Sequence, residues 1–193
     1  MSSPGEHQLY RTGDSNLLSP IRLGLNIDDI VSDFALGIFK VAGVPYDLYK
    51  YILTYDYRPV ITDFKSILNE VKDDRQFWLD LEPLEKSIPD CCTHYLTARY
   101  CPDSITKEWI LRNNLPALPI VNVNHVRCGT PRDLSKTDKL IELGLDGLVD
   151  DKDKHFMDAS SVKPNSFLVS RPWNRNVQTN NRIYRLEELD WRT

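Results

Sequence analysis

Polar side chains that could exchange protons or bind a cation follow a short apolar segment near the N-terminus. Residues 23–34 read LGLNIDDIVSDF, in which Asn26 and Asp28 stand two positions apart. Because side chains alternate along a strand, two residues at this spacing face the same side. If the apolar run is a buried strand, both side chains therefore point into one pocket at its end.

Further polar residues stand at the ends of other apolar segments. Thr97 and Arg99 lie at and after the end of HYLT, and Asp150 and Asp151 follow GLV. In an open parallel sheet, ligands bind beyond the carboxyl ends of the strands. The candidate site therefore consists of the polar residues at these ends: Asn26, Asp28, Thr97, Arg99, Asp150 and Asp151.

Alternating strands and helices are expected to position these residues. Apolar runs bounded by polar residues predict buried strands at 21–26, 94–97, 118–123, 147–149 and 166–170. Apolar residues at three- and four-residue spacing predict helices at 30–39, 46–53, 61–71, 104–113 and 134–143. The tail from residue 181 predicts a final helix or an edge strand. This order is typical of an α/β fold with a Rossmann-like, doubly wound and mainly parallel sheet.

We divide the chain into three parts. Residues 1–19 are polar and rich in Ser, Gly and Pro, and are expected to form a flexible N-terminal segment. Residues 20–33 and 91–193 are expected to form the α/β core. Residues 34–90 contain little that predicts strand, and are expected to form a helical cap inserted after the first strand.

Composition limits the classes of protein to consider. The chain has 193 residues, 41% of them hydrophobic and 27% charged, which suits one globular domain with an insertion. A formal charge of −4 and the lack of a basic run argue against DNA or RNA as a polymer partner. No segment approaches the roughly 20 apolar residues of a membrane helix, so we expect a cytoplasmic protein without a membrane partner.

The cysteines lack the spacing of a zinc site and predict free thiols in a reducing compartment. They are Cys91, Cys92, Cys101 and Cys128.

Several segments, taken in order, resemble motifs of the haloacid dehalogenase superfamily, and in particular of its 5′-deoxyribonucleotidase branch. The first motif, an apolar strand with Asp-x-Asp, resembles Asn26-x-Asp28 followed by Asp33-Phe34. The other resembling segments are FWLDLEPL at 77–84, HYLTAR at 94–99, KTDKLIELGLDGLVDD at 136–151 and RPWN at 171–174. Each motif alone is weak, but their order and spacing from residue 21 to residue 174 make the resemblance specific.

The resemblance implies phosphatase chemistry on a small phosphate ester. The residue at position 26 would attack phosphorus to give an aspartyl-phosphate, and Asp28 would act as general acid and then as base. Contacts to the phosphoryl group and substrate would come from Thr97, Ala98, Arg99 and Lys136. Phe77 and Trp78 are expected either in the core or as a stacking surface for a nucleotide base.

The resemblance also implies a Mg²⁺ cofactor. Asp150 and Asp151 would bind the ion together with the residue at position 26 and the backbone carbonyl of Asp28, because oxygen ligands suit this hard cation. Lys136 is preferred over Lys139 as the phosphate-binding lysine. A homodimer is compatible with the sequence and is left open.

Asn26 stands where the family has its nucleophilic aspartate. A neutral amide is a poor nucleophile, and loss of a covalent nucleophile costs on the order of 10³–10⁶ in rate, so we expect little or no turnover. Asn26 is either an introduced replacement in an active 5′-nucleotidase or the natural residue of a pseudoenzyme that binds a nucleotide or another phosphorylated ligand. A phosphatase acting on a sugar phosphate is a third alternative.

The remaining titratable residues are assigned no chemistry. Asp29 and Asp33 are compatible with a helix start, and Asp33 with a local hydrogen bond. The histidines have no carboxylate or nucleophile partner at a telling spacing and are expected to be structural or at the surface: His94, His125 and His155.

Overall fold

The computed structural model describes residues 19–124 and 135–189. Within these ranges one sheet of six parallel strands has the order β3-β2-β1-β4-β5-β6. The strands are β1 (Leu23–Leu25), β2 (Cys92–Thr97), β3 (Ile120–Asn122), β4 (Gly147–Asp150), β5 (Phe167–Val169) and β6 (Arg182–Ile183). The predicted Rossmann-like α/β fold with a parallel sheet is therefore confirmed.

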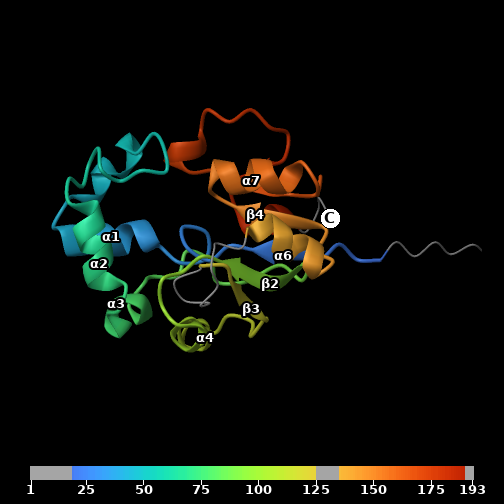
Figure 1. Cartoon of the computed structure of the whole chain (residues 1–193), viewed down its shortest axis with the longest axis horizontal. Coiled ribbons are helices and arrows are strands. Elements are labelled where there is room, and N and C mark those ends of the chain that lie inside the picture. Colours follow the sequence, from blue (N-terminus) through green and yellow to red (C-terminus); the bar gives the residue numbers. More distant parts are fainter. Residues whose placement is uncertain (1–18, 125–134, 190–193) are drawn as a thin grey trace, which may run out of the picture.

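Helices fill the connections between the strands (Figure 1). Those between β1 and β2 are α1 (Phe34–Ala42), the 3₁₀ helix η1 (Tyr46–Tyr51), α2 (Phe64–Val71) and α3 (Arg75–Leu79). The later helices are α4 (Asp103–Arg112), α6 (Lys136–Glu142), α7 (Asp153–Ser160) and the 3₁₀ helices η2 (Pro172–Asn174) and η3 (Leu186–Leu189). Figure 1 shows α1, α2 and α3 grouped beside the sheet rather than on its faces.

Most differences from the predicted elements lie at their ends. No helix was predicted at residues 153–160, where the structure has α7. The tail contains both of the elements offered as alternatives, an edge strand and a short helix. No helix in the ranges that the structure describes is long and apolar enough to cross a bilayer.

Side chains alternate between two apolar layers, as a sheet covered on both faces requires. Leu25, Tyr95 and Val149 belong to a large cluster that includes Trp109 of α4. Their neighbours in sequence Leu96 and Leu148 belong to a second cluster with Leu140 of α6 and Ala159 of α7. Burial on both faces holds the strand ends in register, and therefore holds the polar residues that follow them.

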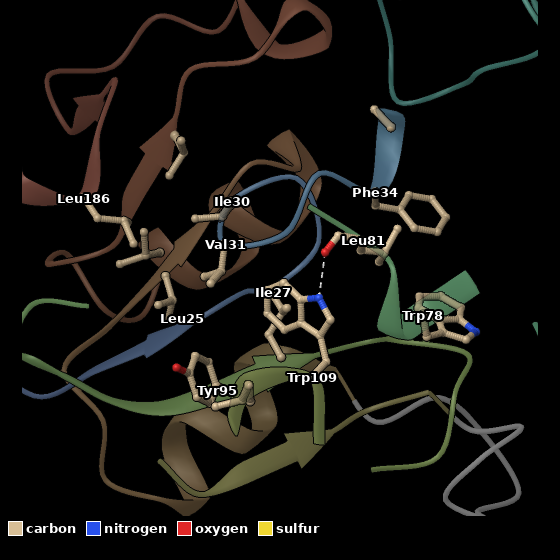
Figure 2. Packing of buried hydrophobic residues seen from close by; sticks show 14 of the residues in the cluster. Leu25, Ile27, Ile30, Val31, Phe34, Trp78, Leu81, Tyr95, Trp109 and Leu186 are labelled. Carbon is tan, nitrogen blue, oxygen red and sulfur yellow. Dashed lines mark hydrogen bonds between the residues drawn. The ribbon is translucent and has the colours of Figure 1, made fainter. Parts of the chain in front are cut away.

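Aromatic packing fixes the helical segment between β1 and β2 against the core. The Phe34 ring stacks on Trp78 at 5.7 Å and meets Phe77 edge-on at 6.1 Å. Trp109 Nε1 donates a hydrogen bond of 2.8 Å to the backbone oxygen of Leu81 (Figure 2). Phe77 and Trp78 thus lie in the core, the first of the two alternatives that the sequence left open.

Candidate functional site

A cavity of about 490 Å³ opens beyond the carboxyl ends of β1, β2 and β4. Parallel strands bring residues that are far apart in the sequence to this edge, as the rule for open sheets predicts. Several predicted site residues line the cavity: Asn26, Asp28, Ala98, Lys136, Asp150 and Asp151.

Asn26 lies at the centre of the polar contacts in this cavity. Its Nδ2 donates to the backbone oxygen of Asp28 and to Asp151 Oδ1, both at 2.9 Å. Its Oδ1 accepts from Lys136 Nζ at 2.8 Å. The side chain is buried, and these contacts use both ends of the amide.

Lys136 is placed by the start of helix α6. Ser135 caps this helix through a capping box with Asp138, which makes Lys136 its first residue. Lys136 Nζ also pairs with Asp150 Oδ2 at 2.6 Å, and both side chains are buried. Lys139 instead pairs with Glu142 on the outer side of α6, so the structure places Lys136 rather than Lys139 in the cavity.

Two carboxyl groups at the end of β4 have pKa values shifted in opposite directions. The Lys136 ammonium and His155 hold the pKa of Asp150 below its usual range, against the effect of burial. Burial, and then the charge of Asp150, raises the pKa of Asp151 to about 7. Within the part of the chain that the structure describes, Asp151 Oδ2 is buried without a hydrogen-bond partner.

The RPWN segment at residues 171–174 holds the backbone of Asp151 in place by hydrogen bonds. Trp173 Nε1 and Asn174 Nδ2 donate to the backbone oxygen of Asp151 at 3.0 and 2.7 Å. Asn174 Nδ2 also donates to Val169 O at the end of β5. The segment therefore fixes the backbone after β4 and makes no contribution to the cavity lining.

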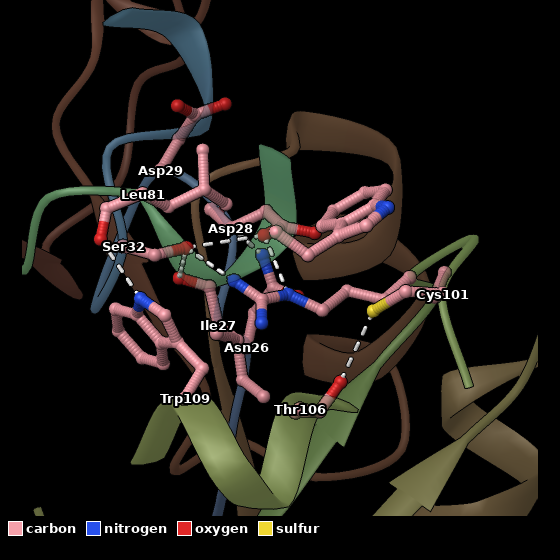
Figure 3. A network of polar contacts seen from close by, with 12 residues as sticks. Asn26, Ile27, Asp28, Asp29, Ser32, Leu81, Cys101, Thr106 and Trp109 are labelled. Carbon is pink, nitrogen blue, oxygen red and sulfur yellow. Dashed lines mark hydrogen bonds and ion pairs between the residues drawn. The ribbon is translucent and has the colours of Figure 1, made fainter. Parts of the chain in front are cut away.

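Arg99 differs from its predicted position in the substrate site. Its side chain is fully buried, and its Nε donates to Asp28 Oδ1 at 2.8 Å. Its Nη2 donates to Ser32 Oγ at 2.6 Å, in the polar network that Figure 3 shows around Asp28. The guanidinium lies 5.5 Å from the Trp78 ring and 5.2 Å from the Trp109 ring. Arg99 therefore orients Asp28 from the core and does not line the cavity.

Thr97 also differs from its predicted role. The residue is fully buried at the end of β2, and only its neighbour Ala98 lines the cavity. Among the described residues, Thr97 Oγ1 has no hydrogen-bond partner. The Thr97 hydroxyl is therefore not positioned to contact a phosphoryl group in the cavity.

Comparison with known proteins identifies the fold. No family model and no curated protein matches the sequence. A solved L-2-haloacid dehalogenase aligns with a TM-score of 0.56 over 90% of this chain and 99% of that chain, at 9% identity. The chain has the haloacid dehalogenase fold. A second solved dehalogenase aligns with a TM-score of 0.48 over 90% of this chain and 96% of that one, at 11% identity.

The haloacid dehalogenase fold brings residues into the cavity that the sequence analysis missed. His155 Nδ1 lies 3.4 Å from Asp150 Oδ2, which corrects the expectation that His155 has no carboxylate partner. Tyr55 and Lys152 line the cavity, and Lys152 Nζ lies 4.6 Å from the Tyr55 ring centre. A helix predicted at residues 153–160 would have indicated His155, because its first turns face the end of β4.

His94, Asp29 and Asp33 do not line the cavity and have structural roles. His94 lies on β2, where burial lowers its pKa, and His125 lies outside the described residues. Asp33 caps α1 by accepting from Leu36 N at 2.8 Å, the local role predicted for it. Asp29 is buried and accepts from Tyr57 Oη at 2.9 Å, and burial raises its pKa. Its φ of 60° lies in the left-handed region that favours glycine.

The residues present do not fit the Mg²⁺ ion that the family resemblance implies. The Asn26 amide directs its N–H groups at Asp28 O and Asp151 Oδ1, two oxygens expected to bind the metal. Both oxygens of Asp150 are used, by Lys136 Nζ and by the backbone N–H of Lys152. Among the described residues, no cluster of three acidic, histidine or cysteine side chains is arranged to hold a metal.

Proposed function

We propose that this chain is a phosphatase-type protein that binds a small phosphate ester, of the nucleoside 5′-monophosphate class, and does not hydrolyse it. The contact that carries this proposal joins Lys136 Nζ to Asn26 Oδ1 at 2.8 Å, just beyond the carboxyl end of β1. It holds a cation next to the position from which a carboxylate would attack phosphorus. A lysine in this place attracts a phosphoryl group and offsets its charge.

The cavity suits a ligand larger than inorganic phosphate. About 490 Å³ lies within the range of small-molecule sites. Lys152 and Tyr55 both line the cavity, with the Lys152 ammonium over the Tyr55 ring. A phosphate that draws Lys152 toward itself would free the ring for an aromatic base. This favours a nucleotide over a sugar phosphate and over a nucleic-acid polymer.

Asn26 explains why the bound ester would remain intact. An amide has no anionic oxygen to bond to phosphorus, so an acyl-phosphate cannot form. In an N26D variant, a carboxylate oxygen would bond to phosphorus while the ester oxygen leaves with a proton supplied at Asp28. Water would then release phosphate and regenerate the carboxylate.

The second candidate is an active phosphatase lineage in which aspartate belongs at position 26. The continued presence of Asp28, Lys136 and Asp150 around the cavity favours it. The N26D variant distinguishes the two functions. Phosphate release by N26D with Mg²⁺ indicates the active lineage, whereas ligand binding without phosphate release indicates a dedicated binder.

Calorimetric titration with deoxy- and ribonucleoside 5′-monophosphates and a sugar phosphate tests the binding proposal. We expect the unmodified chain to bind a nucleoside monophosphate, and K136Q to lose at least about tenfold in affinity. K139Q is the matched control, because Lys139 occupies the same helix and pairs with Glu142 away from the cavity. Equal affinities of K136Q and K139Q, with circular dichroism showing both folded, would contradict the proposed site.

A further inference from the structure

We infer that the Asn26 amide takes the place of a divalent cation, so that this cavity binds its anion without a metal. The metal part of the inference rests on the hydrogen-bond geometry and the charges of the site. The anion part rests on the proposed function.

The orientation of the amide is determined by Lys136. An ammonium group can only donate hydrogen bonds, so the atom of Asn26 that lies 2.8 Å from Lys136 Nζ must be the oxygen. The nitrogen then faces the opposite way, toward Asp28 O and Asp151 Oδ1 at 2.9 Å each. Two N–H groups meet two oxygens, so both donors of the amide are used.

The same two oxygens are hard ligands that a magnesium ion would need. To reach them, the ion would have to displace the N–H groups of Asn26. Turning the amide over would present its oxygen to the ion, but would set its NH₂ group against the Lys136 ammonium. Two donors would then face each other in a buried site. This is costly because the NH₂ group would lose both of its acceptors, and Lys136 would keep only Asp150.

Charge leads to the same conclusion. Lys136 neutralises Asp150 through a buried contact of 2.6 Å. Of the four carboxylate oxygens of Asp150 and Asp151, only Asp151 Oδ2 lacks a hydrogen-bond partner among the described residues. A single carboxylate oxygen is a weak site for Mg²⁺, which also retains its waters strongly. An aspartate at position 26 would add a second carboxylate and remove the competing donors.

Direct titration with Mg²⁺ in the absence of any nucleotide tests the metal part. We expect no heat of binding from the unmodified chain at millimolar Mg²⁺, and N26D to bind at least about tenfold more tightly. In the unmodified chain, the side-chain ¹⁵N–¹H signals of Asn26, assigned by their loss in N26S, should not move when Mg²⁺ is added. The NMR measurement needs no folded N26D.

Inorganic phosphate serves as the anion probe. Its affinity for the unmodified chain should be the same with Mg²⁺ and with a chelator, and its affinity for N26D should rise when Mg²⁺ is present. Mg²⁺ binding by the unmodified chain as tight as by N26D, or a shift of the Asn26 signals, would overturn the inference while leaving anion binding intact. Absence of anion binding without any Mg²⁺ binding would instead refute the proposed function and leave the role of the amide standing.

Discussion

The carboxyl group of Asp151 is buried close to two other acidic groups, Asp29 and Asp150. Burial raises its pKa to about 7, so the folded protein holds a proton there that the unfolded chain releases near pH 4. A raised acid pKa contributes stability that is fully present below the unfolded pKa. This contribution is lost as the pH rises to about 7.

D151N should therefore stabilise the protein in a pH-dependent way. An amide at this position stays neutral and can still accept the hydrogen bond from Asn26 through its oxygen. We expect the free energy of unfolding of D151N to exceed that of the unmodified chain by about 1–3 kcal/mol at pH 8, and the difference to shrink as the pH falls toward 4. Urea denaturation at several pH values measures it.

D158N is the control for this pH series, because Asp158 pairs with Lys154 at the surface of α7. Its effect should stay within about 0.5 kcal/mol at every pH. A D151N difference that does not change with pH would show that the Asp151 carboxyl is not protonated in the folded state.

At the scale of elements, the starts of the helices and strands decide where the side chains of the cavity point. Ser135 caps α6 one residue before Lys136, and Asp33 caps α1 just after the turn that follows Asn26. Gly147 begins β4, whose end carries Asp150. Shifting any of these starts by one residue would turn the following side chain to another face.

The G147A variant tests whether the backbone of Asn165 packs directly against the start of β4. A methyl group at Gly147 would overlap the backbone carbonyl of Asn165, which cannot rotate away as a side chain can. We expect a loss of at least about 2–3 kcal/mol in the free energy of unfolding. Chemical denaturation of the purified variant measures this loss.

G24A is the matched control in the neighbouring strand β1. A methyl group at Gly24 would lie 3.3 Å from the side chains of Leu96 and Leu145, which can adjust. Its cost should stay below about 1 kcal/mol. If the two variants were equally stable, the close approach of β4 to Asn165 would be refuted.

Across the whole molecule, Arg99 connects the helical segment before β2 with the core. Its guanidinium lies between Trp78 of α3 and Trp109 of α4 while its Nε binds Asp28 at the end of β1. The charge is fully buried and paired, so the energy of the contact depends on both partners staying in place. The Arg99 side chain thus holds α3, α4 and the end of β1 together on the core side of the cavity.

R99M should destabilise the entire fold. Methionine fills part of the space between the two tryptophans but leaves Asp28 without its cation, and we expect a loss of about 3 kcal/mol or more. R75M is the control, because Arg75 pairs with Glu108 and is 54% exposed, and should cost less than about 0.5 kcal/mol. Thermal and urea denaturation compare the two, and equal losses would refute the structural role of Arg99.

The amino-acid sequence by itself determined the parallel α/β fold and which strand ends carry polar groups. Apolar runs separated by helical periodicity fix the direction of each strand, and parallel strands bring their carboxyl ends to one edge. The strand ends therefore placed Asn26, Asp28, Asp150 and Asp151 together, and the family resemblance added Lys136 to them.

Only the tertiary structure decided how those side chains are used. It placed Arg99 and Trp78 in the core, hid the Thr97 hydroxyl, and brought His155 to Asp150. It also set the Asn26 amide with its N–H groups where a cation was expected. Local patterns specify which face a residue occupies, but the partner that a buried polar group finds depends on elements that are distant in the chain.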